Sequence, residues 1–102
     1  MEIKYKNSIN DFTVYVSGEL DEYSSSNAKR LLDKLFENVG NTKKIIFDLS
    51  KLSFMDSTGI GLLIGRYKKL SKMSIPIFLR GAKPSIEKVL ELSGLYNIMP
   101  KI

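Results

Sequence analysis

The stretch Leu52-Ser53-Phe54-Met55-Asp56-Ser57-Thr58-Gly59-Ile60-Gly61 separates two segments with different apolar periodicity. The segment before it contains Ile45-Ile46-Phe47 in unbroken succession, which indicates a buried strand covered on both faces, as in a parallel sheet. The segment after it repeats apolar residues at helical spacing. We therefore predict that Ser57 and Thr58 lie at a helix N-terminus, where backbone N–H groups are unpaired and the helix dipole favours negative charge.

The side chains at this helix start have two interpretations. Asp56 and Ser57 are of the residue types favoured as N-caps, and local chemistry alone favours this capping interpretation. A phosphate on Ser57 would also be partly stabilised by the free amides and the helix dipole. Ser57 is therefore a candidate site for a modification that switches the protein between two states.

Two glycines inside the predicted helix need an explanation, because each costs a helix ~1 kcal/mol relative to alanine. Gly61 and Gly65 follow Ser57 at intervals of four residues, so the three share one helix face. Either the helix packs closely on its own sheet there, or this face is an exposed shallow groove that another backbone can approach. The remaining apolar residues predict a separate, core-facing stripe: Ile60, Leu63, Ile64, Tyr67 and Leu70.

The rest of the chain alternates strand and helix patterns. We predict strands at Glu2–Lys6 and Phe12–Ser17 as a hairpin, a helix from Ser24–Asn27 to Val39, a strand at Lys43–Leu49, a helix from about Ser57 to Lys72, a strand at Ile75–Leu79, a helix from Pro84 to Ser93, and a final strand or packed tail over 95–102. This order predicts an α/β fold, a single small domain over residues 1–102 with a mixed, mostly parallel sheet and crossover helices. Asp21 and Ser57 both follow strands, and sites gather at the C-terminal ends of parallel strands.

The amino-acid composition excludes several kinds of catalytic and metal-binding site. The 102 residues include no cysteine and no histidine, so disulfides, thiolate nucleophiles and the commonest general base and metal ligand are excluded. We expect no metal and no cofactor. No stretch approaches the ~20 apolar residues of a membrane helix, and the first residues lack a signal-peptide core, so we expect a cytoplasmic protein with no membrane partner.

The net charge is +5, and the excess lies around the central stretch. Seven basic residues fall between positions 43 and 72: Lys43, Lys44, Lys51, Arg66, Lys68, Lys69 and Lys72. A nucleic-acid partner is possible on charge alone, but no Gly-rich phosphate loop or aromatic stacking motif accompanies it. We interpret the basic residues mainly as a solvated face that could steer an acidic partner.

Three motifs carry a family resemblance. Asp56-Ser57-Thr58-Gly59-Ile60-Gly61, continued by residues 62–68, resembles the Asp-Ser-Ser/Thr-Gly-Leu/Ile-Gly motif of the anti-sigma factor antagonists of the STAS-domain family. Gly18-Glu19-Leu20-Asp21 and Glu91-Leu92-Ser93-Gly94-Leu95 match in the family's order and spacing. The resemblance implies a STAS-like fold and a bacterial regulator that a serine kinase phosphorylates at Ser57.

The resemblance also implies the partners. The unmodified protein would bind an anti-sigma factor that is itself a serine kinase, which frees a sigma factor, and a metal-dependent serine phosphatase would reverse the modification. Because the loop matching Asp21 lies beside the phosphorylation site in the family, Asp21 joins the expected partner-binding residues: Asp21, Asp56, Ser57, Thr58, Gly59, Gly61 and Gly65. None of these is expected to be catalytic. The basic composition departs from many such relatives, which are acidic.

Two other functions compete with this one. Similar domains occur as accessory subunits of transport or signalling assemblies, where no phosphorylation is needed. A small hydrolase using Ser57 with Asp56 is disfavoured, because the chain lacks a histidine and adjacent helix residues do not face each other.

Overall fold

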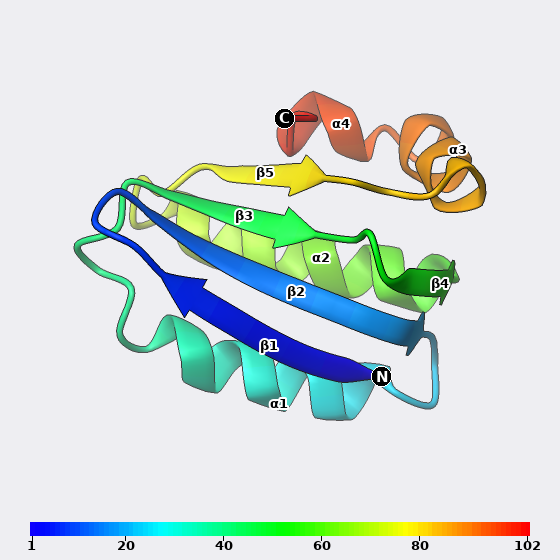
Figure 1. Cartoon of the computed structure of the whole chain (residues 1–102), viewed down its shortest axis with the longest axis horizontal. Helices are drawn as coiled ribbons and strands as arrows, with labels where there is room; N and C mark the ends of the chain where they lie inside the picture. Colours follow the sequence, from blue (N-terminus) through cyan, green and yellow to red (C-terminus); the bar gives the residue numbers. More distant parts are fainter.

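The computed structural model describes the whole chain, Met1 to Ile102, as five strands and four helices. In chain order they are β1 (Glu2–Asn7), β2 (Asp11–Leu20), α1 (Ser25–Phe36), β3 (Lys44–Asp48), β4 (Leu52–Met55), α2 (Ser57–Ser71), β5 (Ile77–Arg80), α3 (Pro84–Leu92) and α4 (Leu95–Ile98). The mixed α/β fold with an N-terminal hairpin and crossover helices, which the sequence predicts, is confirmed (Figure 1).

The sheet is mixed, and its longest strand, β2, pairs with β1, β3 and β4. The strand order is β1-β2-β3-β5, with β1 antiparallel to β2 and the remaining pairs parallel. Residues 11–15 of β2 pair with β3, whereas residues 18–20 pair with β4. The register shifts between Gly18 and Glu19, and Gly18 has a φ of +85°, a backbone conformation that glycine adopts without strain. The glycine therefore bends β2 toward β4, and the strand continues to Leu20.

The helices lie on one face of the sheet (Figure 1). Alternate residues of β2, Phe12, Val14 and Val16, join the hydrophobic core beneath the helices. The expectation that β3 is covered on both faces by a parallel α/β arrangement is wrong. Ile46 is buried at 4% exposure, but it is flanked in register by Thr13 and Phe78 of the neighbouring strands and is not part of the helix-covered core.

Helix α2 buries a face that is rotated from the predicted stripe. Its buried residues are Gly59, Leu62, Leu63, Arg66 and Leu70, while Ile60, Ile64 and Tyr67 are half-buried at the edge of the core. The predicted stripe missed the centre of the buried face, because a pattern built from hydrophobic residues leaves out Gly59 and Arg66. Both residues are accommodated by tertiary contacts that the sequence pattern does not show.

The sequence predicted a final strand or a packed tail over residues 95–102, and the structure instead combines a short helix with a single β-bridge. Residues 95–98 form the short helix α4, and Lys101 then makes a parallel bridge to Leu79 of β5. The N–H of Leu79 donates to the carbonyl of Pro100, and the N–H of Ile102 donates to the carbonyl of Leu79, both at 3.0 Å. The C-terminal residues thus cover the β5 edge of the sheet.

Candidate functional site

Asp56 caps α2 at the point where β4 ends. Its Oδ1 accepts hydrogen bonds from the backbone N–H groups of Thr58 (2.9 Å) and Gly59 (3.1 Å), and its backbone is extended. The capping interpretation is therefore confirmed for Asp56. Ser57 is the first residue of the helix and its hydroxyl makes no hydrogen bond, so capping leaves this hydroxyl available.

Asp21 organises the neighbouring loop between β2 and α1. Its Oδ1 accepts from the N–H groups of Tyr23 and Ser24, both at 3.0 Å. The hydroxyl of Ser24 accepts from the N–H of Asp21 (3.0 Å) and donates to the carbonyl of Glu19 (2.9 Å). These reciprocal bonds fix the turn, so Asp21 has a structural role as a turn residue. A part in partner binding stays a prediction.

The structure joins these two loops. β2 and β4 run parallel with Leu20 opposite Met55, so both strands end at the same edge. The N–H of Asp56 donates to the carbonyl of Leu20 at 3.3 Å, and the N–H of Glu22 donates to Oδ2 of Asp56 at 3.3 Å. Asp56 therefore uses one carboxylate oxygen for the helix and the other for the β2–α1 loop. The predicted convergence of the two strand ends follows from this pairing.

Gly59 is the residue that allows α2 to approach β2. A Cβ at this position would lie 2.6 Å from the backbone carbonyl oxygen of Leu20 and 2.9 Å from Cγ of Met55. Backbone cannot yield as a flexible side chain can, so only glycine fits here. Gly59 therefore has a packing role, which the sequence analysis assigned to Gly61 and Gly65 as one of two possibilities.

The other two glycines lie on an open surface. A Cβ at Gly61 or at Gly65 would have no atom within 4 Å, so close packing on the protein's own sheet does not explain either residue. Ser57, Thr58 and Gly61 are exposed, and Gly65 is partly exposed. We call these four residues the switch face. It is a low, accessible surface that starts at the helix N-terminus.

Sequence reasoning missed two exposed aromatic residues on the elements that adjoin the start of α2. Tyr23, in the β2–α1 loop, is 88% exposed, and Phe54, on β4, is 48% exposed. Exposed aromatic side chains are the residue type that anchors protein interfaces. Strand β4 was not predicted because four residues are too few to show periodicity, so no pattern indicated that Phe54 would face solvent.

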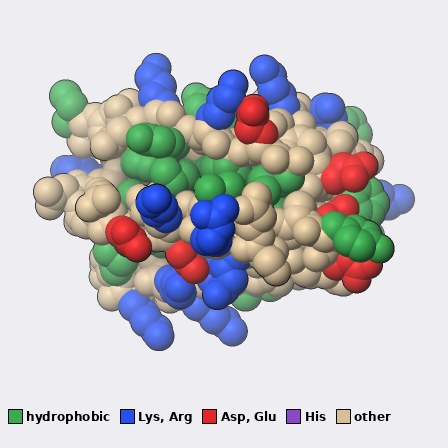
Figure 2. All heavy atoms as spheres, turned by 90° about the horizontal axis from the view of Figure 1, so that it is seen from below, with side chains coloured by type: hydrophobic (Ala, Val, Ile, Leu, Met, Phe, Trp, Pro, Cys, Tyr) green, Lys and Arg blue, Asp and Glu red, His purple; other side chains and the backbone are tan.

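The loops around the switch face are acidic although the chain is basic. Glu19 and Glu22 are exposed, and they join Asp21 and Asp56 at this end of the sheet. At the end where β2 leads into α1, Figure 2 shows acidic side chains gathered around a hydrophobic one. The net charge of the chain is positive, whereas the local charge at this surface is negative.

Asp48 lies at the end of β3 and is engaged with its neighbours. Its Oδ1 accepts from the N–H (3.0 Å) and the hydroxyl (2.6 Å) of Ser50, and its Oδ2 accepts from Nε of Arg80 at 3.0 Å. Burial raises the pKa of Asp48, but the hydrogen bonds from Ser50 and the Arg80 guanidinium outweigh it, so the pKa lies below the ordinary value. Asp48 therefore binds its own neighbours, the following turn through Ser50 and β5 through Arg80.

Comparison with known proteins places this geometry in a family. The STAS domain profile matches residues 1–102. The anti-sigma F factor antagonist of Paenibacillus polymyxa is 33% identical over 87 residues, which are 85% of this chain and 74% of that protein. The anti-sigma-B factor antagonist of Staphylococcus aureus (strain NCTC 8325 / PS 47) is 32% identical over 88 residues, which are 86% of this chain and 80% of that protein.

The fold is also similar to those of solved structures of anti-sigma factor antagonists. The anti-sigma factor antagonist SpoIIAA in its unphosphorylated form aligns with a TM-score of 0.79 and 26% identity, covering 99% of this chain and 88% of that one. The Bacillus cell fate determinant SpoIIAA in the phosphorylated form aligns with a TM-score of 0.71 and 27% identity, covering 99% and 91%. Taken with the capped helix start and the match across every residue, these similarities show that the chain belongs to the STAS domain family.

Proposed function

We propose that this protein is an anti-sigma factor antagonist that binds an anti-sigma factor with serine kinase activity through the switch face. The observation that carries the proposal is the free hydroxyl of Ser57 at the first position of α2, with Asp56 already occupying the helix amides. The relatives named as antagonists support the regulatory role. In this proposal the chain is a binding protein whose own residues catalyse nothing.

Phosphorylation of Ser57 would switch binding off through charge. A phosphate adds about −1.5 to −2 charges at neutral pH. The amides of Thr58 and Gly59, which could otherwise hold a phosphate, already bind Asp56. The phosphate would therefore project from the surface into a region that Asp56, Asp21 and Glu22 already make negative. A kinase surface that fits the neutral serine would lose contact and meet repulsion, and a serine phosphatase would restore the binding form.

The open side of the helix supports close docking of a protein. Since no atom lies within 4 Å of the missing Cβ positions of Gly61 and Gly65, a partner's backbone can approach α2 there. Exposed aromatic rings on the β2–α1 loop (Tyr23) and on β4 (Phe54), the elements that adjoin the start of α2, would supply apolar contact area. None of the four helices combines the length and the apolar character that a membrane span requires.

Labelling identifies the phosphate acceptor. The chain and its Ser57→Ala and Thr58→Ala variants are incubated with ATP and the anti-sigma factor kinase recovered from the bacterial host. Phosphopeptide mass spectrometry is expected to find phosphate on Ser57 in the wild type and in Thr58→Ala, the matched control. Full labelling of Ser57→Ala would refute the assignment.

Calorimetry tests the switch itself. Ser57→Ala is expected to bind the kinase as the unmodified protein does, because the surface stays neutral. Ser57→Asp is expected to bind more weakly, although one charge is only a partial substitute for a phosphate. Equal affinities of the wild type and Ser57→Asp would contradict a charge-based mechanism. Capture of membrane transport components in place of a kinase would favour an accessory role.

A further inference from the structure

The two edges of the sheet differ in whether the chain covers them. The β5 edge is covered by residues 100–102, which hydrogen-bond to Leu79. Strand β1 pairs with β2 on one side, and no strand of the chain pairs with its other side. An edge strand of this kind presents a row of N–H and C=O groups to which another strand can add.

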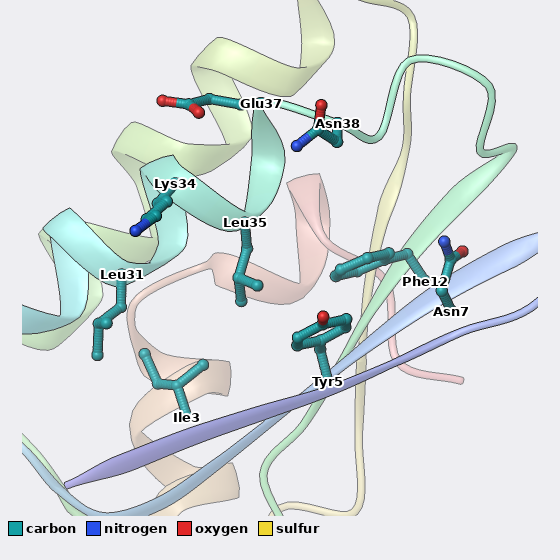
Figure 3. Close-up of a pocket in the computed structure, with 9 residues that line it drawn as sticks. All are labelled: Ile3, Tyr5, Asn7, Phe12, Leu31, Lys34, Leu35, Glu37 and Asn38. Atoms are coloured by element: carbon teal, nitrogen blue, oxygen red, sulfur yellow. The ribbon is translucent and has the colours of Figure 1, made fainter.

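An apolar groove lies beside this free edge, between β1 and α1. It encloses about 440 Å3, and its apolar lining comes from both elements: Ile3, Tyr5, Phe12, Leu31 and Leu35. Figure 3 shows Leu31 and Leu35 pointing from the helix toward Ile3 and Tyr5 on the strand. The ring of Tyr5 stacks on that of Phe12 with centroids 5.3 Å apart, yet Tyr5 is 58% exposed. The groove is therefore a pre-formed apolar surface that remains open to solvent.

The charged residues around the groove include both signs, so they do not select a partner of one charge. Lys34 and Glu37 line the α1 side. On β1, the exposed residues Glu2, Lys4 and Lys6 alternate with the residues that face the groove. An interface between two identical copies needs a mixed surface of this kind, because a two-fold axis places the same patch of both chains in contact.

The sequence of β1 is complementary to itself in one antiparallel register. Residues directly opposite each other in an antiparallel pair lie on the same face of the sheet. When Ile3 lies opposite Ile3 of a second copy, Glu2 of each chain lies opposite Lys4 of the other. On the groove face of the same register, Met1 lies opposite Tyr5. This register therefore pairs opposite charges on one face of the sheet and apolar residues on the other.

Other registers that keep the same faces opposite each other fit less well. A shift that places Glu2, Lys4 or Lys6 opposite its own equivalent opposes like charges on the axis. A register centred on Tyr5 sets Lys4 of each chain against Lys6 of the other. Like charges directly opposite each other on paired strands are destabilising. The charge pattern on one face of β1 and the apolar pattern on the other therefore favour the same register, centred on Ile3.

We propose that the free edge of β1 binds the same edge of a second copy, with Ile3 on the two-fold axis, so that the sheets of the two chains become continuous. The two grooves then meet at the axis, and Leu31 and Leu35 of both copies pack beneath the joined strands. Each Glu2, which lies 3.7 Å from Lys4 of its own chain, also pairs with Lys4 of the second copy. No residue of the switch face lines the groove, so the dimer leaves both switch faces free.

A strand of one charge from a different protein fits this edge less well. Lysine on an edge strand discourages pairing, and a strand of alternating acidic residues would neutralise Lys4 and Lys6. The same strand would oppose Glu2 on β1 and would approach Glu37 on α1. A second copy presents a lysine to each Glu2 and a glutamate to each Lys4, so charge complementarity selects it.

Sedimentation equilibrium of the full chain measures this association over a range of concentrations. A monomer–dimer equilibrium is expected, and hydrogen exchange is expected to show protection of the β1 amides that increases with protein concentration. A chain that stays monomeric at every concentration would overturn the proposal and would leave the edge to a strand of a different protein.

Charge exchange locates the interface and its register. Lys4→Glu sets a glutamate against Glu2 of the other copy at two places and is expected to weaken the dimer about tenfold. Lys6→Glu makes the same change in net charge on the same strand and is the matched control. In this register Lys6 lies beyond the end of the second copy's strand, so a much smaller effect is expected.

The double variant Glu2→Lys/Lys4→Glu restores two pairs of opposite charge and is expected to recover the association of the wild type. All three residues are exposed, so these changes leave the core intact. Equal losses for Lys4→Glu and Lys6→Glu, or a double variant that associates no better than Lys4→Glu, would overturn the proposed pairing of β1 with itself.

Discussion

Contacts of single atoms decide the roles of the two glycines in the central stretch, Gly59 and Gly61. Gly59 faces the carbonyl of Leu20, and a Cβ there would be 2.6 Å from that oxygen. Gly61 is two residues along the helix and points to open space. Two residues of the same type, in the same helix turn, are therefore needed for different reasons: one for the fold and the other, as proposed, for access by a partner.

Substitution by alanine separates these reasons. Gly59→Ala is expected to lower the free energy of unfolding by about 1–3 kcal/mol, because the new methyl overpacks the contact with β2. Gly61→Ala is expected to leave it unchanged or raise it by up to ~1 kcal/mol, since alanine is the better helix former. Urea melts measure both. If Gly61→Ala lost as much stability as Gly59→Ala, the open surface described for α2 would be wrong.

The same pair of variants informs the interface. With the proposed kinase, Gly61→Ala is expected to bind more weakly than the wild type, because a methyl group holds the partner away from the helix. A binding titration at a temperature where both proteins are folded makes this comparison. Normal binding by Gly61→Ala would remove this residue from the interface while leaving Ser57 as the modified residue.

Asp48 gives the molecule a pH dependence at the residue scale. Because its folded pKa lies below the ordinary value, the folded state binds this proton less readily than the unfolded state does. Its stabilising contribution is therefore complete above about pH 5 and is lost as the pH falls through the folded pKa. Asp48→Asn is expected to cost about 1 kcal/mol at pH 7 and progressively less toward pH 3. Urea melts at the two pH values measure this, with Asp11→Asn as a control whose carboxylate has no ion pair. A cost that does not change with pH would contradict it.

At the scale of elements, an ion pair between a buried arginine and a partly exposed aspartate joins the two large helices. Arg66 of α2 is 4% exposed, and its NH1 lies 3.2 Å from Oδ1 of Asp33 on α1. Lys29 and Lys69 also approach Asp33, at 4.0 and 3.3 Å. One carboxylate thus faces three cations, so it is the partner whose loss leaves most charge uncompensated.

Removing the carboxylate is expected to destabilise the α1–α2 contact. Asp33→Ala is expected to lower the free energy of unfolding by about 2 kcal/mol, less than for a fully buried pair because Asp33 is partly exposed. In an Arg66→Met background the same change is expected to cost much less, since no buried charge is left without a partner. Chemical unfolding of the two single variants and the double variant completes the cycle. Additive costs would show that the pair contributes no coupling.

At the scale of the whole molecule, charge is distributed unevenly. The chain carries a net charge of +5, yet the loops beside Ser57 present Glu19, Asp21, Glu22 and Asp56. The overall charge governs general attraction, whereas the local field governs how a partner approaches a particular face. Any partner of the switch face is therefore expected to present a basic surface, opposite to what net charge suggests.

Association kinetics test this local field. The double variant Glu19→Gln/Glu22→Gln is expected to associate with the kinase about 2- to 5-fold more slowly at low salt, and the difference is expected to vanish at high salt. Glu91→Gln, an exposed acid on α3, is the matched control. Stopped-flow measurements give the rates. A faster association of the double variant would mean that the partner surface is acidic.

Most of the fold and the centre of the site could be predicted from local pattern. The alternation of residues 2–6 and 12–17, the apolar run in β3 and the cap at Asp56 each depend on near neighbours, and each forms where expected. The sequence pattern did not predict strand β4 or the rotation of the buried face of α2. Four residues show no period, and a buried arginine is stable only because Asp33, far away in sequence, lies beside it.

The sequence by itself determined the class of fold, the helix start at Ser57 and the family, because periodicity, caps and motifs are properties of short segments. Only the tertiary structure decided which glycine is packed and which is open, since the Cβ of Gly59 meets a carbonyl from another strand. It also decided that β1 remains an open edge and that the helices cover a single face. Those outcomes depend on which segments meet in space, and contact between distant segments leaves no local pattern for a sequence to show.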